Sequence, residues 1–147
     1  MKSLAITFLL ARAVSPALGA GFTLGDPGTF SVEEAAGGAL AHDIYTLTLD
    51  GKGRVVVSGP GYIRLLEDPD GDGRFDAARD FHRGPANGCQ GMVFHGRALY
   101  TVGGAGIERY LDLDEDGVAD GPPELLLRLG MAGEHGPHAV RVGPDGL

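Results

Sequence analysis

Two stretches of this chain place aspartates at alternate positions, which is the pattern of a short calcium-binding loop. Residues 68–76 read DPDGDGRFD and residues 112–120 read DLDEDGVAD, so both follow D-x-D-x-D-G-x-x-D at a separation of 44 residues. A hard cation such as Ca²⁺ takes about six to eight oxygen ligands, and alternating carboxylates let a short loop wrap around it. The spacing therefore predicts two calcium loops, one in each of two repeated units.

The predicted metal ligands are the first, third, fifth and ninth residues of each loop. They are Asp68, Asp70, Asp72 and Asp76 in the first loop, and Asp112, Asp114, Asp116 and Asp120 in the second. The twelfth position, where an EF-hand has its bidentate glutamate, holds Arg79 and Pro123. Asp80 and Glu124, one residue later, are candidates to complete the ligand shell. The alternative is a solvated acidic turn that binds no ion.

Short strands separated by turn residues fill the chain from residue 41 onward. The first unit has predicted strands at 46–49, 54–58, 62–66 and 77–82, and the second at 91–94, 97–102, 106–111 and 124–129. A third unit opens with 139–142 and a turn at 143–146. Four strands at this period are typical of a propeller blade. The predicted fold is all-β: a partial β-propeller of two four-stranded blades plus the start of a third, with Asp-rich hairpin calcium loops. A β-sandwich with acidic hairpins is the alternative.

The N-terminal residues have the composition of an export signal. Lys2 precedes the apolar residues 4–11, and residues 16–20 are small, although Arg12 interrupts the apolar run. The expected organisation is a signal peptide at 1–20, a flexible segment at 21–40 and an incomplete propeller domain at 41–147, in a periplasmic or secreted protein. A closed propeller has about four to eight blades, so we expect a fragment of a longer protein. No segment is long enough to be a transmembrane helix.

Composition excludes several classes of partner and site. The chain has 26 Gly, 9 Pro, no Trp and a net charge of −8. Most of its acidic residues lie in the two loops and their flanks, where bound calcium would offset their charge. No basic stripe is present, so nucleic acid is not an expected partner. Cys89 is the only cysteine, which excludes an intrachain disulfide and a C-x-x-C-H haem attachment site.

Polar residues recur just before or within the first predicted strand of each unit. At one position these residues are His42, Asn87 and His135, and three residues later they are Tyr45, Gln90 and His138. The first strand of a propeller blade lies innermost, so these side chains are predicted to meet at one rim of the central channel, where ligands bind. His42, Asn87 and Gln90 are the predicted substrate-rim residues. Each could instead cap a strand or bond a backbone carbonyl.

The stretch Glu134-His135-Gly136-Pro137-His138 combines two imidazoles with a carboxylate. An imidazole accepts a proton near neutral pH, which suits general-base oxidation of an alcohol. His135 and His138 are therefore the candidate catalytic residues. Two histidines and a glutamate could instead bind a transition metal.

Three segments carry a family resemblance: residues 65–74, residues 112–120 and above all residues 134–146, which read EHGPHAVRVGPDG. Together they resemble the N-terminal β-propeller of the membrane-bound dehydrogenase family, which is often fused to cytochrome c, and more distantly the soluble quinoprotein glucose dehydrogenases. In the quinoprotein relatives, a histidine eight residues before a G-P-D turn takes the hydroxyl proton of the sugar. His135 has that spacing from Gly143.

The resemblance implies an exported, quinone-dependent dehydrogenase that oxidises a sugar or alcohol with His135 as general base. It implies Ca²⁺ and the quinone PQQ as cofactors and an electron acceptor such as cytochrome c, with haem c only where a downstream domain exists. The residues expected to bind the quinone would lie in later blades, so this chain alone is expected to be inactive. The alternative is a non-enzymatic, calcium-stabilised propeller that binds a polysaccharide or a protein.

Overall fold

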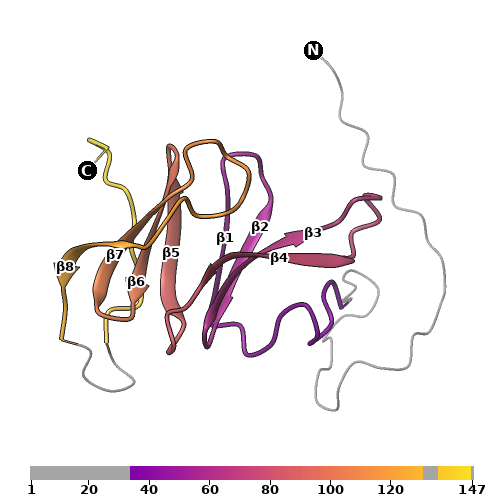
Figure 1. Ribbon diagram of the computed structural model, residues 1–147, viewed down its shortest axis with the longest axis horizontal. Helices are drawn as coiled ribbons and strands as arrows, with labels where there is room; N and C mark the ends of the chain where they lie inside the picture. The colour runs from indigo at the N-terminus through magenta and orange to yellow at the C-terminus, as the bar shows by residue number, and fades with distance from the viewer. Residues whose placement is uncertain (1–33, 131–135, 147) are drawn as a thin grey trace, which may run out of the picture. The chain divides into compact units, whose positions relative to one another are not determined.

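The computed structural model describes residues 34–130 and 136–146, and all of the regular structure in those ranges is β-strand (Figure 1). The first four strands are β1 (Thr46–Leu49), β2 (Val55–Gly59), β3 (Tyr62–Glu67) and β4 (Ala77–Arg83). The next four are β5 (Cys89–His95), β6 (Ala98–Gly103), β7 (Gly106–Leu111) and β8 (Glu124–Arg128). Within the described ranges, no helix is long and apolar enough to cross a membrane.

The strands form two four-stranded antiparallel sheets, each a simple meander. Their orders are β1-β2-β3-β4 and β5-β6-β7-β8, so every strand pairs with its neighbour in sequence. The prediction of an all-β fold with four strands per unit is confirmed, and each of these eight strands lies within about two residues of its predicted bounds. Local turn chemistry explains the agreement, because short turns between consecutive strands require antiparallel neighbours.

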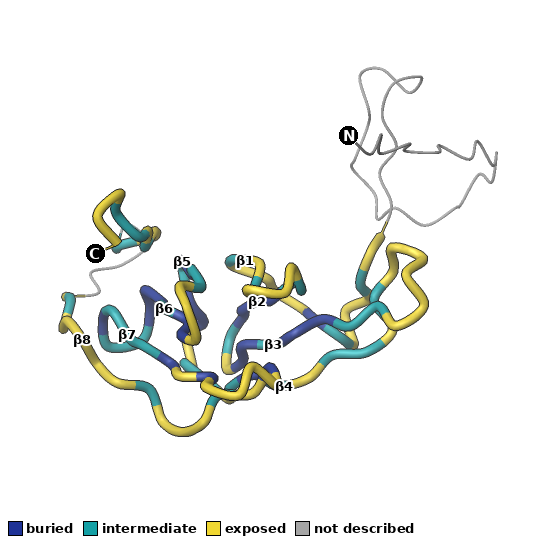
Figure 2. The backbone as a smooth tube through the Cα atoms, turned by 90° about the horizontal axis from the view of Figure 1, so that it is seen from above, coloured by how far each residue is buried: buried dark blue, intermediate teal, exposed yellow. Residues whose placement is uncertain are grey.

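The main core lies between the two sheets. Alternate residues along a strand point to opposite faces, so each sheet offers one row of apolar side chains to the other. The first sheet contributes Val56, Ile63, Leu65 and Phe81, and the second contributes Cys89, Met92, Leu99 and Tyr110. Figure 2 shows buried segments on strands of both sheets. Burial of these rows against each other gives the two sheets a shared core.

The opposite face of the first sheet packs against the segment that precedes β1. Val57, Tyr62 and Leu66 form a second buried cluster with Ala41, and Ala36 and Leu40 pack against it. The compact unit accordingly begins at Ala35. The predicted domain start at residue 41 therefore falls inside a segment that contacts the sheet, and the predicted signal peptide lies outside the described residues.

The first strands of the two sheets, β1 and β5, lie side by side (Figures 1 and 2). Residues 138–139 lie in turn against β5, because a Cβ added to Gly91 would stand 2.6 Å from the carbonyl oxygen of His138. The predicted turn at 143–146 is present, with the Gly146 amide donating to the Gly143 carbonyl at 3.0 Å. The predicted strand at 139–142 is not formed, since no described residue pairs with it in a ladder.

Candidate metal centres

Both aspartate loops join the third and fourth strands of their sheets, β3 to β4 and β7 to β8. Each begins one residue after its strand ends, so the strand directs the first aspartate into the loop. Gly73 and Gly117 both have φ of 90°, a left-handed conformation that favours glycine and turns the loop back on itself. The two loops therefore fold by the same local rule.

The first loop gathers three of its four predicted ligands. Oxygen atoms of Asp68, Asp70 and Asp76 lie within 4.8 Å of one another. Both oxygens of Asp68 already accept amide hydrogen bonds, from Gly71 at 2.8 Å and from Gly73 at 3.0 Å. Asp72 lies outside the triad, and its Oδ1 accepts a hydrogen bond from the Arg74 amide at 2.7 Å. This triad is mostly exposed and its first carboxylate is well supplied with donors.

The second loop gathers a different set of three. Oxygen atoms of Asp112, Asp114 and Asp116 lie within 4.8 Å of one another. Asp120, which corresponds to Asp76, lies outside the triad, and its Oδ2 accepts a hydrogen bond from the Leu113 amide at 2.6 Å. The same sequence pattern therefore brings together positions one, three and nine in one loop and positions one, three and five in the other.

Asp112 is a buried carboxylate with one oxygen that lacks a hydrogen-bond partner. It is 5% exposed, and its Oδ2 accepts a hydrogen bond from the Gly117 amide at 3.2 Å, whereas its buried Oδ1 has no hydrogen-bond partner. Burial raises the pKa of this carboxyl, and the negative charges of Asp116 and Asp114 raise the pKa further. A buried oxygen without a donor is costly unless a cation satisfies it. The all-oxygen donor set fits Ca²⁺, which prefers carboxylate ligands.

Asp80 and Glu124 face arginines and do not join the triads. Asp80 pairs with Arg64 at 2.9 Å and with Arg83 at 3.4 Å, and the hydrogen bond from Arg64 is the main cause that lowers the pKa of Asp80. Glu124 pairs with Arg109 at 2.5 Å. The expectation that these two residues complete a metal shell therefore finds no support in their contacts.

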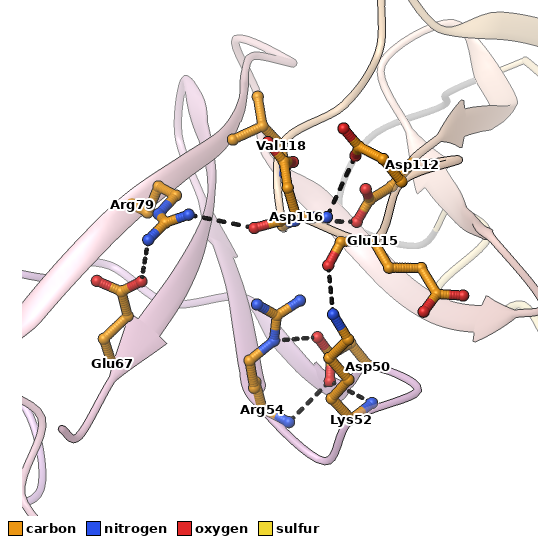
Figure 3. Close-up of polar contacts among 11 residues, drawn as sticks. Asp50, Lys52, Arg54, Glu67, Arg79, Asp112, Glu115, Asp116 and Val118 are labelled. Atoms are coloured by element: carbon orange, nitrogen blue, oxygen red, sulfur yellow. Dashed lines mark hydrogen bonds and ion pairs between the residues drawn. The ribbon is translucent and has the colours of Figure 1, made fainter.

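Basic side chains from the first sheet reach the second loop, and the sequence did not indicate this contact. Lys52 Nζ donates to the carbonyl oxygen of Glu115 at 2.7 Å, and Arg79 Nη1 donates to that of Asp116 at 3.2 Å (Figure 3). These partners stand 63 and 37 residues apart in the sequence. No local pattern links such distant residues. Only the charge of the chain pointed toward this contact, since the few basic residues of an acidic chain tend to lie near acidic loops.

The predicted rim residues come from the segment before β1 and from β5 with the loop that precedes it. His42 precedes β1, where its ring contacts Tyr62 and its Nδ1 lies 3.4 Å from Asp43 Oδ2. Asn87 is exposed between β4 and β5, and Gln90 is half-buried in β5. His138 is exposed beside β5, and His135 lies outside the described residues.

An open hollow of about 320 Å³ lies where the first strands meet. Thr46 of β1, residues 91–93 of β5 and residues 138–141 line it. Of the described rim residues, His138 alone contributes to this lining. The hollow therefore adjoins His138, and its lining does not include His42, Asn87 or Gln90.

Comparison with family models, with curated proteins and with solved structures finds no match to this chain. The dehydrogenase resemblance consequently stays a hypothesis that rests on residues 134–146 and the two loops.

Proposed function

We propose that this chain is a calcium-stabilised β-propeller module whose principal calcium site is the loop 112–120. The observation that carries the proposal is the Asp112 carboxylate: its buried Oδ1 has no hydrogen-bond partner, and the carboxylate belongs to the triad with Asp114 and Asp116 whose ligand oxygens lie within 4.8 Å of one another. In this proposal Asp112, Asp114 and Asp116 hold the ion, which supplies the positive charge that the buried carboxylate lacks. Loop 68–76 is a second, weaker site, because amide donors already satisfy Asp68.

The arrangement of the sheets supports the propeller part of the proposal. Consecutive four-stranded meanders share a core, their first strands lie side by side, and residues 138–139 lie against β5. A propeller arranges its blades in this manner around a central channel. Closure takes about four to eight blades, so a ring would need units beyond the two described sheets.

Isothermal titration calorimetry with CaCl₂ tests the calcium site on the full chain after removal of metal with EGTA. We expect saturable binding that Asp112→Asn weakens at least tenfold, because an amide at this position keeps the shape but loses the charge. Asp72→Asn is the matched control, since Asp72 lies outside the first triad. Wild-type protein that takes up no calcium, or an Asp112→Asn variant with wild-type affinity, would refute the site.

A second candidate function is oxidation of a sugar or alcohol with His135 as base. The observation that favours it is the hollow beside β5, because residues 138–141 line it only a few positions after His135. An open hollow next to the innermost strands is where a propeller offers room for a small polar substrate. Arg141 and His138 add polar groups to its wall.

The residues expected to bind the quinone would lie in later blades, so a dye-linked oxidation assay with added PQQ and Ca²⁺ tests this second candidate in a longer protein that includes those blades. We expect dye reduction with a sugar or alcohol, and its loss in His135→Ala because no base then takes the hydroxyl proton. His95→Ala is the matched control, as His95 is exposed at the end of β5. An inactive wild type, or full activity in His135→Ala, would contradict the dehydrogenase reading.

A further inference from the structure

We propose that loop 112–120 is a calcium-dependent clasp that holds the first sheet against the second. The inference rests on the proposed calcium site and adds a role for it. In this role the ion does more than order its own hairpin: binding sets how firmly the two sheets pack together.

The outer surface of this loop contacts the first sheet at four of its residues. The Glu115 carbonyl accepts a hydrogen bond from Lys52, and the Asp116 carbonyl accepts one from Arg79 (Figure 3). The Ala119 amide donates to the carbonyl of Phe81 in β4 at 2.9 Å. Three of these contacts use loop backbone, so they depend on the path of the loop.

Gly117 provides the fourth contact, where the loop backbone comes close to side chains of the first sheet. A Cβ at this position would stand 3.0 Å from Leu65 Cδ2 and 3.2 Å from one guanidinium nitrogen of Arg54. Gly117 also donates its amide to Asp112 Oδ2 at 3.2 Å. The same residue therefore packs on the first sheet with one side and binds the buried carboxylate with the other.

The first loop makes an equivalent contact with the chain that precedes its own sheet. Phe75 and Ala119 are both the eighth residue of their loops, and the Phe75 amide donates to the carbonyl of Ala35 at 2.7 Å. Phe75 also packs against the cluster that includes Ala36 and Leu40. In both loops, therefore, the amide of the eighth residue donates to a carbonyl outside the loop. In the first loop that carbonyl belongs to the segment before β1, and in the second it belongs to the other sheet.

The two faces of the loop explain how calcium acts on the contact. Three carboxylates that converge within 4.8 Å repel one another, and a cation removes that repulsion. The aspartate carboxylates turn inward to the triad while the carbonyls of residues 115 and 116 turn outward to Lys52 and Arg79. An ion that draws the carboxylates together thus fixes the outward carbonyls. By linkage, the sheet contacts and calcium must strengthen each other by the same factor.

Hydrogen exchange read by mass spectrometry, with and without CaCl₂, tests the clasp on the full chain. We expect calcium to slow exchange at least tenfold in peptides that cover residues 112–120 and also in those that cover β4 of the other sheet. Asp114→Asn should remove both effects. Asp70→Asn, the matched change in the first loop, should leave the slowing in β4 intact.

The outcomes separate the clasp from the calcium site itself. If calcium binds and protects residues 112–120 but leaves β4 unchanged, the clasp is refuted and the calcium site stands. If calcium neither binds nor protects either region, the proposed function fails as well. Circular dichroism of each variant without metal checks that the strands remain folded.

Calcium affinity of two variants with substitutions in the first sheet provides an independent test of the clasp. Lys52→Gln and Arg79→Gln remove the cations that donate to the loop carbonyls and leave the triad carboxylates in place, although Arg79→Gln also breaks the ion pair with Glu67. Charge alone would tighten calcium binding after either change, because a nearby cation is lost. The clasp predicts the opposite, a loss of roughly threefold to tenfold in calcium affinity. An unchanged or tighter affinity in both variants would overturn it.

Discussion

The hydroxyl of Ser58 joins the two sheets through the amide of Cys89. Ser58 Oγ accepts a hydrogen bond from the Cys89 amide at 3.0 Å and donates one to the carbonyl of Tyr62 at 2.9 Å. Ser58 and Cys89 are fully buried, so water cannot replace either bond. The shared core thus contains a polar link where the second sheet begins.

Ser58→Ala should lower the free energy of unfolding by about 1–3 kcal/mol, because it leaves the Cys89 amide buried without an acceptor. Urea unfolding followed by circular dichroism measures the change. The slope of the transition should stay the same, since the surface exposed on unfolding is similar. A midpoint equal to that of the wild type would show that the hydroxyl contributes nothing to the packing of the sheets.

Tyr62 holds the segment before β1 in place through a pair of hydrogen bonds. Its hydroxyl donates to the His42 carbonyl at 2.5 Å and accepts from the His42 amide at 3.1 Å. Tyr62→Phe should cost about 1–2 kcal/mol and speed proteolysis near residue 42. Tyr45→Phe removes a hydroxyl from a half-exposed tyrosine and serves as control. Equal proteolysis of the two variants would contradict the anchoring role.

Glu115 carries a backbone strain that its counterpart in the first loop avoids. Its φ is 59°, whereas Gly71 at the same loop position has φ of 73°. Glu115→Gly should therefore raise the free energy of unfolding by about 1 kcal/mol, and Gly71→Ala should lower it by about 1 kcal/mol. A Cβ on Gly71 would meet no atom within 4 Å, so its cost is backbone strain alone. Thermal unfolding without calcium measures the stability change of each variant. Melting temperatures that shift in the same direction in the two variants would contradict the role of backbone strain.

His82 makes stability fall in acid. Burial lowers the pKa of this imidazole below its ordinary value of 6.5, and its Nδ1 is buried without a partner. As pH falls below about 6.5, the unfolded chain takes up a proton that the folded chain refuses, so stability declines until the folded pKa is reached. His82→Phe keeps the edge contact of the ring with Tyr110 and should remove this part of the decline. The melting temperatures of the wild type and His82→Phe, measured between pH 7 and pH 5, check this prediction. If both fall equally with pH, His82 does not contribute to the loss of stability in acid.

Much of the secondary structure was predictable because it is local. Alternating apolar residues and short turns specify strands such as 62–66 and 106–111, and the repeat of Asp68 at Asp112 specifies two units of equal order. The strand at 139–142 was not predictable in the same manner. A ladder needs a partner strand, and the described chain provides none there.

The candidate metal site was predictable only in part. The spacing identified both loops and their first and third aspartates, since a short loop brings alternate side chains together whatever surrounds it. It did not predict that Asp76 joins one triad while Asp116 joins the other. Nor did it predict that Asp80 pairs with Arg64, which lies on the neighbouring strand. Those outcomes depend on side chains that come from other strands.

The sequence by itself determined that this protein is built from four-stranded units, each with an acidic loop between its third and fourth strands. Tertiary structure decided in which loop the first aspartate is buried. Loop 112–120 lies against Leu65 and Phe81 of the other sheet, so Asp112 loses its water and keeps an oxygen without a donor. Two loops with the same aspartate spacing thus differ in the environment of their first carboxylate, because neighbouring residues determine how far it is desolvated, and the spacing of the aspartates does not specify those neighbours.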